Sequence, residues 1–154
     1  LRSRWADDAL AHRPDWLSVK NGINDCNRWC TDAEANPLQS PETYEKIYDQ
    51  LLALTRQRLP EVKILLIDPF YASHHRSIEV EDSYRGRVAR ALEDYLAAVK
   101  RMAQKYDTLH VKTNDLFWNH FEDKPPSLFF PNEPVHPNQT GHIFIAEAVY
   151  NALR

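Results

Sequence analysis

The sequence lacks several features that would mark a broad class of protein. Its 154 residues include only three glycines and two cysteines. The glycines stand apart, at 22, 86 and 141, so no Gly-rich phosphate loop can be built. A zinc site takes about four ligands, and small secreted scaffolds are richer in cysteine. Cys26 and Cys30 are therefore expected to be free thiols. The compartment stays open, with the cytoplasm slightly favoured.

Strong charge and long hydrophobic runs are also missing. The net charge is −3 and charges of both signs are interspersed, which gives no electrostatic reason to expect a nucleic acid partner. Apolar runs such as 64–67 are far shorter than the roughly 20 residues that span a bilayer, so no membrane partner is expected. Among seven histidines only His74 and His75 are adjacent. Adjacent residues rarely share one ligand geometry, so no metal site is predicted.

The chain does have a clear apolar pattern, in which segments with the period of a strand alternate with segments with the period of a helix. Strands are predicted at 15–20, 62–68 and 109–112, and helices at 1–12, 41–59, 82–106, 115–121 and 143–153. The nearly unbroken apolar run at 62–68 is typical of a parallel strand covered on both faces. The pattern predicts one domain over residues 1–154, an α/β/α three-layer sandwich with a mostly parallel, flavodoxin-like sheet.

Polar segments follow these strands where a parallel sheet places its binding sites. Residues 22–25 are predicted to form a loop after the first strand, and 69–81 a long loop after the second. Residues 132–136 come after the third strand and a helical turn. Because ligands bind at the carboxyl ends of parallel strands, the three segments are expected to converge there. This convergence favours an enzyme.

The residues of these segments suit acyl transfer, which needs a base, an orienting acid and donors for a developing oxyanion. His136 is the candidate base and Glu133 the orienting acid, on a loop stiffened by prolines. Asn24 is the candidate oxyanion donor. The same residues also have purely structural explanations. His136 would be a loop histidine that caps the last helix, Glu133 a solvated carboxylate and Asn24 a turn residue. Gly22, Phe70 and Tyr71 are candidate substrate-binding residues, although core packing would explain the two aromatics equally well.

Two motifs together resemble the SGNH hydrolases, the GDSL-type esterases and lipases. Gly22-Ile23-Asn24-Asp25, led by Pro14-Asp15-Trp16-Leu17, is similar to the Gly-x-Asn-Asp block, and residues 133–142 are similar to the closing block. The resemblance implies an SGNH-type sheet and a serine esterase. Its substrates would be small-molecule acyl or acetyl esters of carbohydrates or small alcohols. It further implies that Asn24 is the oxyanion donor, that His136 is the general base, and that no metal or organic cofactor is needed.

The chain departs from the family pattern at two points. No Gly-Asp-Ser nucleophile block occurs, and the closing acid, usually Asp, is Glu133. The resemblance therefore implies that N-terminal strands are missing and that this chain alone does not hydrolyse esters. The strand at 15–20 is then expected to show an open apolar edge through which copies self-associate.

Two other functions remain open at this point. One is a non-catalytic binding module derived from the same fold, which would need no nucleophile. The other is a flavodoxin-like module with a coincidental histidine loop, which would need an anion site at a helix N-terminus.

Overall fold

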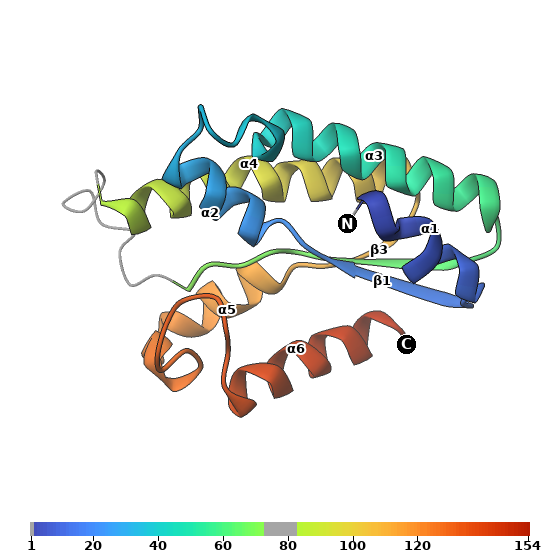
Figure 1. The fold of residues 1–154 in the computed structure, drawn as a ribbon. Coiled ribbons are helices and arrows are strands. Elements are labelled where there is room, and N and C mark those ends of the chain that lie inside the picture. The colour runs from blue at the N-terminus through green and yellow to red at the C-terminus, as the bar shows by residue number, and fades with distance from the viewer. Residues whose placement is uncertain (1, 73–82) are drawn as a thin grey trace.

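A parallel sheet forms the centre of this computed structural model, which describes residues 2–72 and 83–154 (Figure 1). Its strands are β1 (Trp16–Lys20), β2 (Lys63–Ile67) and β3 (Leu109–Val111), in the spatial order β1-β2-β3. Both pairings are parallel, with Val19 opposite Leu66 and Leu66 opposite His110. The predicted strands and their parallel arrangement are confirmed.

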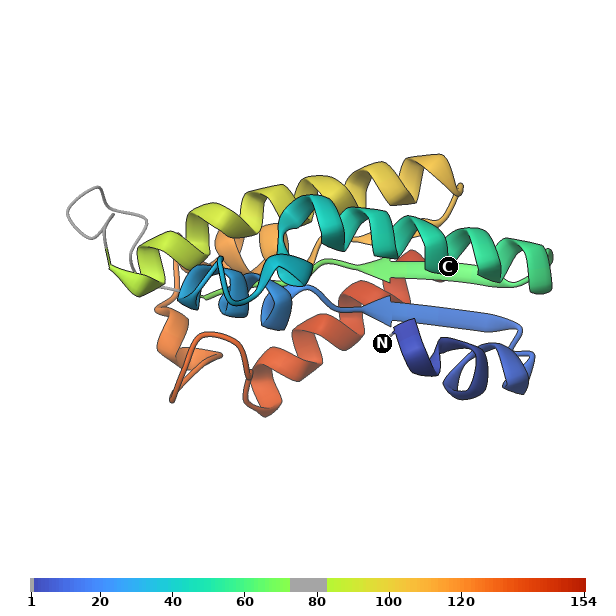
Figure 2. The ribbon, with the colours of Figure 1, turned by 45° about the horizontal axis from the view of Figure 1, so that its top comes forward.

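Helices cover the sheet on both faces (Figures 1 and 2). On one side lie α2 (Ile23–Thr31), α3 (Pro41–Arg58) and α4 (Tyr84–Lys105), and on the other α5 (Thr113–Phe121) and α6 (Gln139–Ala152). The short helical turns are η1 (Arg2–Arg4), α1 (Trp5–Asp8), η2 (Leu10–His12), η3 (Pro37–Gln39) and η5 (Pro126–Leu128). In the described ranges, no helix has both the length and the hydropathy to cross a membrane.

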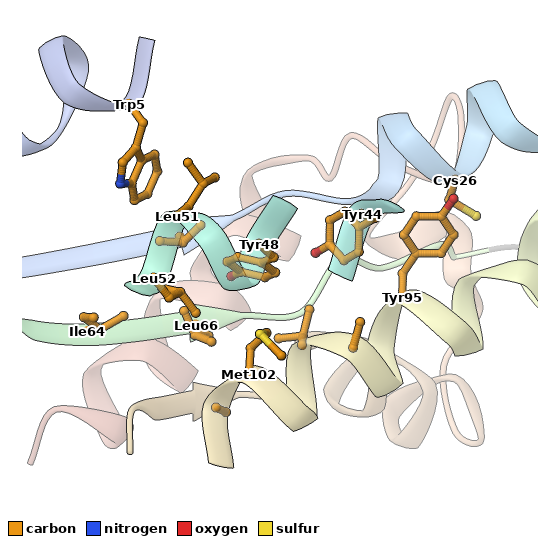
Figure 3. Packing of buried hydrophobic residues seen from close by; sticks show 14 of the residues in the cluster. Trp5, Cys26, Tyr44, Tyr48, Leu51, Leu52, Ile64, Leu66, Tyr95 and Met102 are labelled. Atoms are coloured by element: carbon orange, nitrogen blue, oxygen red, sulfur yellow. The ribbon is translucent and has the colours of Figure 1, made fainter. Parts of the chain in front are cut away.

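Side chains of β2 alternate between two apolar clusters, which explains its unbroken hydrophobic sequence. Ile64 and Leu66 join the main core beneath α3 and α4, where Figure 3 shows them beside Leu52. Leu65 and Ile67 face the other way and pack with α6. Burying one such side chain stabilises the fold by about 1.5–3 kcal/mol. This one strand therefore contributes buried apolar side chains to the packing on both faces of the sheet.

Capping residues set the starts of two helices. The Ser40 hydroxyl accepts a hydrogen bond from the backbone N–H of Thr43 at 3.2 Å, and Pro41 is the first residue of α3. Asn138 caps α6 by accepting from the Gly141 N–H at 3.1 Å. Both caps follow from the preference for short polar side chains at this position.

Several predicted elements differ from the structure, among them the last helix, which begins at Gln139 rather than at Ile143. The helix expected over residues 1–12 is divided into η1, α1 and η2, although its Trp5 is buried and donates to the Thr55 hydroxyl at 3.0 Å. The loop expected at 22–25 is the start of α2, because Gly22, with φ of 116°, turns the chain directly from strand to helix. Helix α5 begins at Thr113 rather than at Asp115. Most of the predicted 69–81 loop, with His74 and His75, lies outside the described residues.

Candidate active site

The predicted acid and base lie together on the loop before α6. Nδ1 of His136 donates to Oε1 of Glu133. That carboxylate also accepts from the backbone N–H of His136 at 2.9 Å and of Val135 at 3.1 Å. Two backbone amides thus fix the carboxylate, and the carboxylate fixes the ring. The extra methylene of Glu133, compared with Asp, does not prevent this contact.

The hydrogen bond at Nδ1 determines what the imidazole can do. When Nδ1 carries the proton, Nε2 has a free lone pair. The His136 side chain is 87% exposed, whereas Glu133 is 38% exposed, so the ring extends out of the loop toward solvent. An imidazole in this tautomer can accept a proton from a hydroxyl group, with the carboxylate stabilising the imidazolium that forms.

The loop itself is held by the chain on both sides of the acid–histidine pair. On one side, the backbone N–H of Ala72 donates to the carbonyl of Pro134 at 2.9 Å. On the other, the Asn138 backbone N–H donates to the Phe129 carbonyl at 2.7 Å, and its side chain donates to the Leu128 carbonyl at 2.8 Å. The loop is therefore anchored to the segment that follows β2 and to residues 128–129, which precede the loop.

The closing motif needs glycine at position 141 for steric reasons. A Cβ at Gly141 would lie 2.5 Å from Cβ of Pro137, and 3.3 Å from the Phe129 carbonyl oxygen. Pro137 is a rigid ring and cannot move aside alone. The absence of a side chain at 141 thus lets the first turn of α6 pack directly under the residue that follows His136.

The oxyanion candidate lies on the first turn of α2. Asn24 is exposed there, as the second residue of the helix, in the turn whose backbone N–H groups have no intrahelical acceptor. Gly22 precedes it, and a Cβ on Gly22 would lie 3.0 Å from the Tyr44 hydroxyl and 3.2 Å from Pro69. An amide side chain and a helix N-terminus both favour negative charge, as an oxyanion donor requires.

Core packing brings the two halves of the site to the same edge of the sheet. Val135, from the His136 loop, and Ile23 of α2 both pack against the main core cluster, which contains Cys26. Tyr71 belongs to this cluster, and both Cys26 and Glu133 act electrostatically on its hydroxyl. Burial raises the pKa of Tyr71 to about 12. The predicted convergence of segments 22–25, 69–81 and 132–136 is therefore present for residues 22–25, 69–72 and 132–136, whereas residues 73–81 lie outside the described residues.

The two aromatic residues predicted to bind substrate are both buried. Phe70 is 3% exposed and packs edge-on against Phe117, with ring centroids 5.0 Å apart. Tyr71 is 4% exposed. A substrate role for Phe70, Tyr71 and Gly22 stays a prediction, since the rings lie beneath the site.

Three polar residues near the site were not singled out from the sequence. The Lys20 ammonium lies 4.1 Å from the centre of the Phe70 ring, and burial lowers its pKa. Nε2 of His110 donates to Oδ1 of the buried Asp68 at 2.6 Å. Desolvation raises the pKa of Asp68, and the bond to His110 opposes that rise. The sequence signal for Asp68 is an acidic residue at the end of an apolar run. Its contact with His110 depends on strand register, which the sequence does not reveal.

Metal-binding groups do not gather in the described part of the chain. No three histidine, cysteine, aspartate or glutamate side chains there are placed to hold an ion. Both cysteines are free thiols, and burial raises the pKa of Cys26 well above its usual range.

A parallel α/β sandwich with an acid–histidine pair and an amide donor at its carboxyl edge has the layout of a hydrolase domain. The chain belongs to the GDSL-like lipase/acylhydrolase family, whose profile matches residues 1–143. It is 29% identical over 150 residues to an acetylxylan esterase from Geobacillus stearothermophilus, covering 96% of this chain and 63% of that protein.

Solved structures give the same result. The crystal structure of the Geobacillus stearothermophilus acetylxylan esterase superposes with a TM-score of 0.81 and 27% identity, covering 99% of this chain and 65% of the other. A putative GDSL-like lipase from Parabacteroides merdae gives a TM-score of 0.83 and 27% identity, with 99% and 66% coverage. This chain therefore spans just under two thirds of the length of these relatives.

Catalytic mutants of the Geobacillus esterase have also been solved. They replace a serine near the beginning of that chain, an aspartate and a histidine, each by alanine. The aspartate and histidine of that enzyme have the same order and spacing as Glu133 and His136 here.

Proposed function

We propose that this chain provides the acid–base pair and an oxyanion donor of a serine esterase that cleaves acetyl or acyl esters of carbohydrates or small alcohols. The serine would reside on a segment that is not among these 154 residues. The observation that carries the proposal is the Glu133–His136 pair, fixed by two backbone amides with Nε2 turned outward. The catalytic aspartate and histidine of the esterase relative, with the same spacing, support it.

In the proposed reaction the serine hydroxyl attacks the ester carbonyl while Nε2 of His136 takes its proton. Glu133 holds the ring and stabilises the imidazolium, and Asn24 donates to the oxyanion of the tetrahedral intermediate. The imidazolium then protonates the departing alcohol, leaving an acyl-serine. Water hydrolyses the acyl-serine by the same route, with His136 again acting as the base.

The experiment is a chimera in which the N-terminal segment of the Geobacillus esterase, including its catalytic serine, is fused ahead of residue 2. We expect turnover of p-nitrophenyl acetate and release of acetate from acetylated xylo-oligosaccharides. His136→Ala should abolish turnover, and Asn24→Ala should lower kcat by about 10²- to 10³-fold, as loss of one oxyanion donor does. Glu147→Ala, on the exposed side of α6, is the matched control.

The 154-residue chain without the segment should show no such turnover. A folded chimera with no His136-dependent activity would contradict the proposal and favour a non-catalytic binding module. Activity of the unextended chain that requires His136 would contradict the assignment of the nucleophile to another segment.

A further inference from the structure

A small hollow of about 170 Å³ opens beside the candidate acid, and Glu133 forms part of its wall. Phe130 and Ala72, each 5% exposed, line it together with Pro134. Phe130 packs edge-on against Phe117 at 4.8 Å between ring centroids, and the Ala72 N–H is bonded to the Pro134 carbonyl at 2.9 Å. Because these contacts fix the wall, the hollow is preformed and a ligand would not have to order it.

The remaining lining of the hollow is polar and carries one positive charge. Ser127, Asn132 and Arg85 all line it, and all three are exposed. A hydroxyl, an amide and a guanidinium can each donate hydrogen bonds. The planar guanidinium can also bind both oxygens of a carboxylate at once. These donors suit an anionic group better than an apolar one.

The position of Arg85 in its helix leaves its charge unbalanced. Arg85 is the second residue of α4, whose start is capped by Ser83, the hydroxyl of which accepts from the Gly86 N–H at 3.0 Å. No acidic residue lies in this first turn. A cation is unfavourable at the start of a helix, where unbonded N–H groups already create positive charge. An anion bound at Arg85 would therefore remove an electrostatic cost.

Glu133 shares this region but does not neutralise Arg85. Figures 1 and 2 show the start of α4 and the loop before α6 at the same end of the sheet. Arg85 and Glu133 both act electrostatically on the Tyr71 hydroxyl, yet among the described residues no carboxylate forms an ion pair with Arg85. The Glu133 carboxylate accepts from Nδ1 of His136 and from two backbone amides instead. The guanidinium is thus open to a second anion.

We propose that this hollow receives a carboxylate carried by the alcohol part of the ester, so that the enzyme prefers acyl esters of acidic carbohydrates to those of neutral ones. The carboxylate would accept two hydrogen bonds from Arg85, with the Asn132 amide and the Ser127 hydroxyl as further donors. This inference rests on the proposed function and adds the class of alcohol on which it acts.

The proposed catalytic roles place the alcohol part, rather than the acyl part, beside the hollow. His136 protonates the departing alcohol in that reaction, so the alcohol oxygen lies near Nε2. Glu133 contacts the same imidazole and lines the hollow, so one side chain separates the hollow from the reaction centre. The acyl oxygen is directed instead toward Asn24 on α2.

The test uses the chimera and two matched substrates. One is an acetylated xylo-oligosaccharide with a glucuronic acid branch, and the other is the same compound with its carboxyl group converted to a methyl ester. We expect kcat/KM to be about tenfold higher for the acid, the usual effect of hydrogen bonds to a charged group. The gain should lie in KM with kcat unchanged, because the carboxylate makes the same contacts in the ground state and the transition state.

Variants of the lining distinguish a role in specificity from a structural one. Arg85→Ala should remove the preference for the acid, and Arg85→Lys should keep part of it, since the charge remains but the fork is lost. Asn132→Asp adds a negative charge at nearly constant shape and should also lower the preference. Lys100→Ala, at another exposed cation of α4, is the matched control. A purely structural effect of Arg85 would change kcat for both substrates alike and leave their ratio unaltered.

Binding of glucuronate to the 154-residue chain gives a measurement that needs no turnover. We expect glucuronate, but not its methyl ester, to shift the NMR signals of the Arg85 Nε–H and the Asn132 side-chain amide in a saturable way. Arg85→Ala should abolish the saturable shift at Asn132, and Lys100→Ala should leave it unchanged.

Equal kcat/KM for the two substrates, or a preference that survives Arg85→Ala, would overturn the inference. An Arg85-dependent preference for p-nitrophenyl hydrogen succinate over p-nitrophenyl acetate would do so too, because it would place the carboxylate on the acyl side. A chimera that lacks His136-dependent turnover of p-nitrophenyl acetate, while the chain still binds glucuronate through Arg85, would refute the proposed function and support the carboxylate site. The two ideas are therefore tested separately.

Discussion

At the scale of single residues, the Glu133 carboxylate has two roles. It accepts hydrogen bonds from the His136 imidazole and from the backbone of its own loop. We expect Glu133→Ala to raise the hydrogen-exchange rates of the Val135 and His136 amides about tenfold or more, because two charge-assisted hydrogen bonds are lost. Exchange measured by NMR on the 154-residue chain tests this. Glu147→Ala is the control, and unchanged amide exchange in Glu133→Ala would show that the carboxylate does not order the loop.

Gly22 is the second residue whose identity is set by its surroundings. Its φ of 116° is a region that L side chains rarely adopt, and a Cβ would crowd Tyr44 and Pro69. Gly22→Ala should lower the free energy of unfolding by about 1–3 kcal/mol, the usual cost of such strain. Urea denaturation measures this, with Gln50→Ala on the exposed side of α3 as control. An unaltered midpoint would mean that the turn can relax.

At the scale of secondary-structure elements, the Asp68–His110 pair ties the ends of β2 and β3 together. Asp68 also accepts from the Thr113 hydroxyl through its carbonyl at 2.7 Å, so one residue joins both strands and α5. The next residues, 69–72, contact the turn at Gly22 and bond to Pro134. The Asp68–His110 pair thus helps to position residues 69–72, which contact both the Gly22 turn and the loop of the candidate acid and base.

We expect His110→Ala to destabilise the protein by about 3 kcal/mol at neutral pH, because the buried carboxylate loses its partner. Burial already raises the pKa of Asp68, so the folded protein binds a proton at this carboxylate at a higher pH than the unfolded chain does. The penalty exists above the folded-state pKa and is relieved below it, so the difference from the parent should narrow as the pH falls toward 4. Denaturation at several pH values tests this; a difference that is constant with pH would contradict it.

Local sequence signals predicted the strands and the long helices, because apolar periods such as those at 41–59 and 62–68 reflect contacts between residues close together in the chain. The acid–histidine contact was predictable for the same reason, as three residues separate its members. Helix α2 was missed because its start depends on the backbone of Gly22 rather than on an apolar repeat. The Lys20–Phe70 and Asp68–His110 contacts depend on which strands are neighbours, and no local pattern reveals that.

At the scale of the whole molecule, the open edge of β1 should govern how the isolated chain behaves. We expect the 154-residue chain to associate with rising concentration through this edge, since exposed strand edges and apolar side chains pair with other chains. Trp16→Lys should reduce association, because a charge at the edge opposes strand pairing. Sedimentation velocity across a concentration series measures it, with Gln50→Lys as control. A chain that stays monomeric throughout would show that the edge is protected.

The bond between Ala72 and Pro134 has a bearing on how the site assembles during folding. The Glu133–His136 contact closes a loop of a few residues, at small entropic cost, so it can form before the sheet does. The approach of that loop to α2 is different, because more than a hundred residues separate Asn24 from His136 and the loop is bound, through Ala72, to the segment that follows β2. The proposed role of His136 as proton acceptor thus depends on a short-range contact, whereas its alignment with Asn24, the proposed oxyanion donor, requires the native topology.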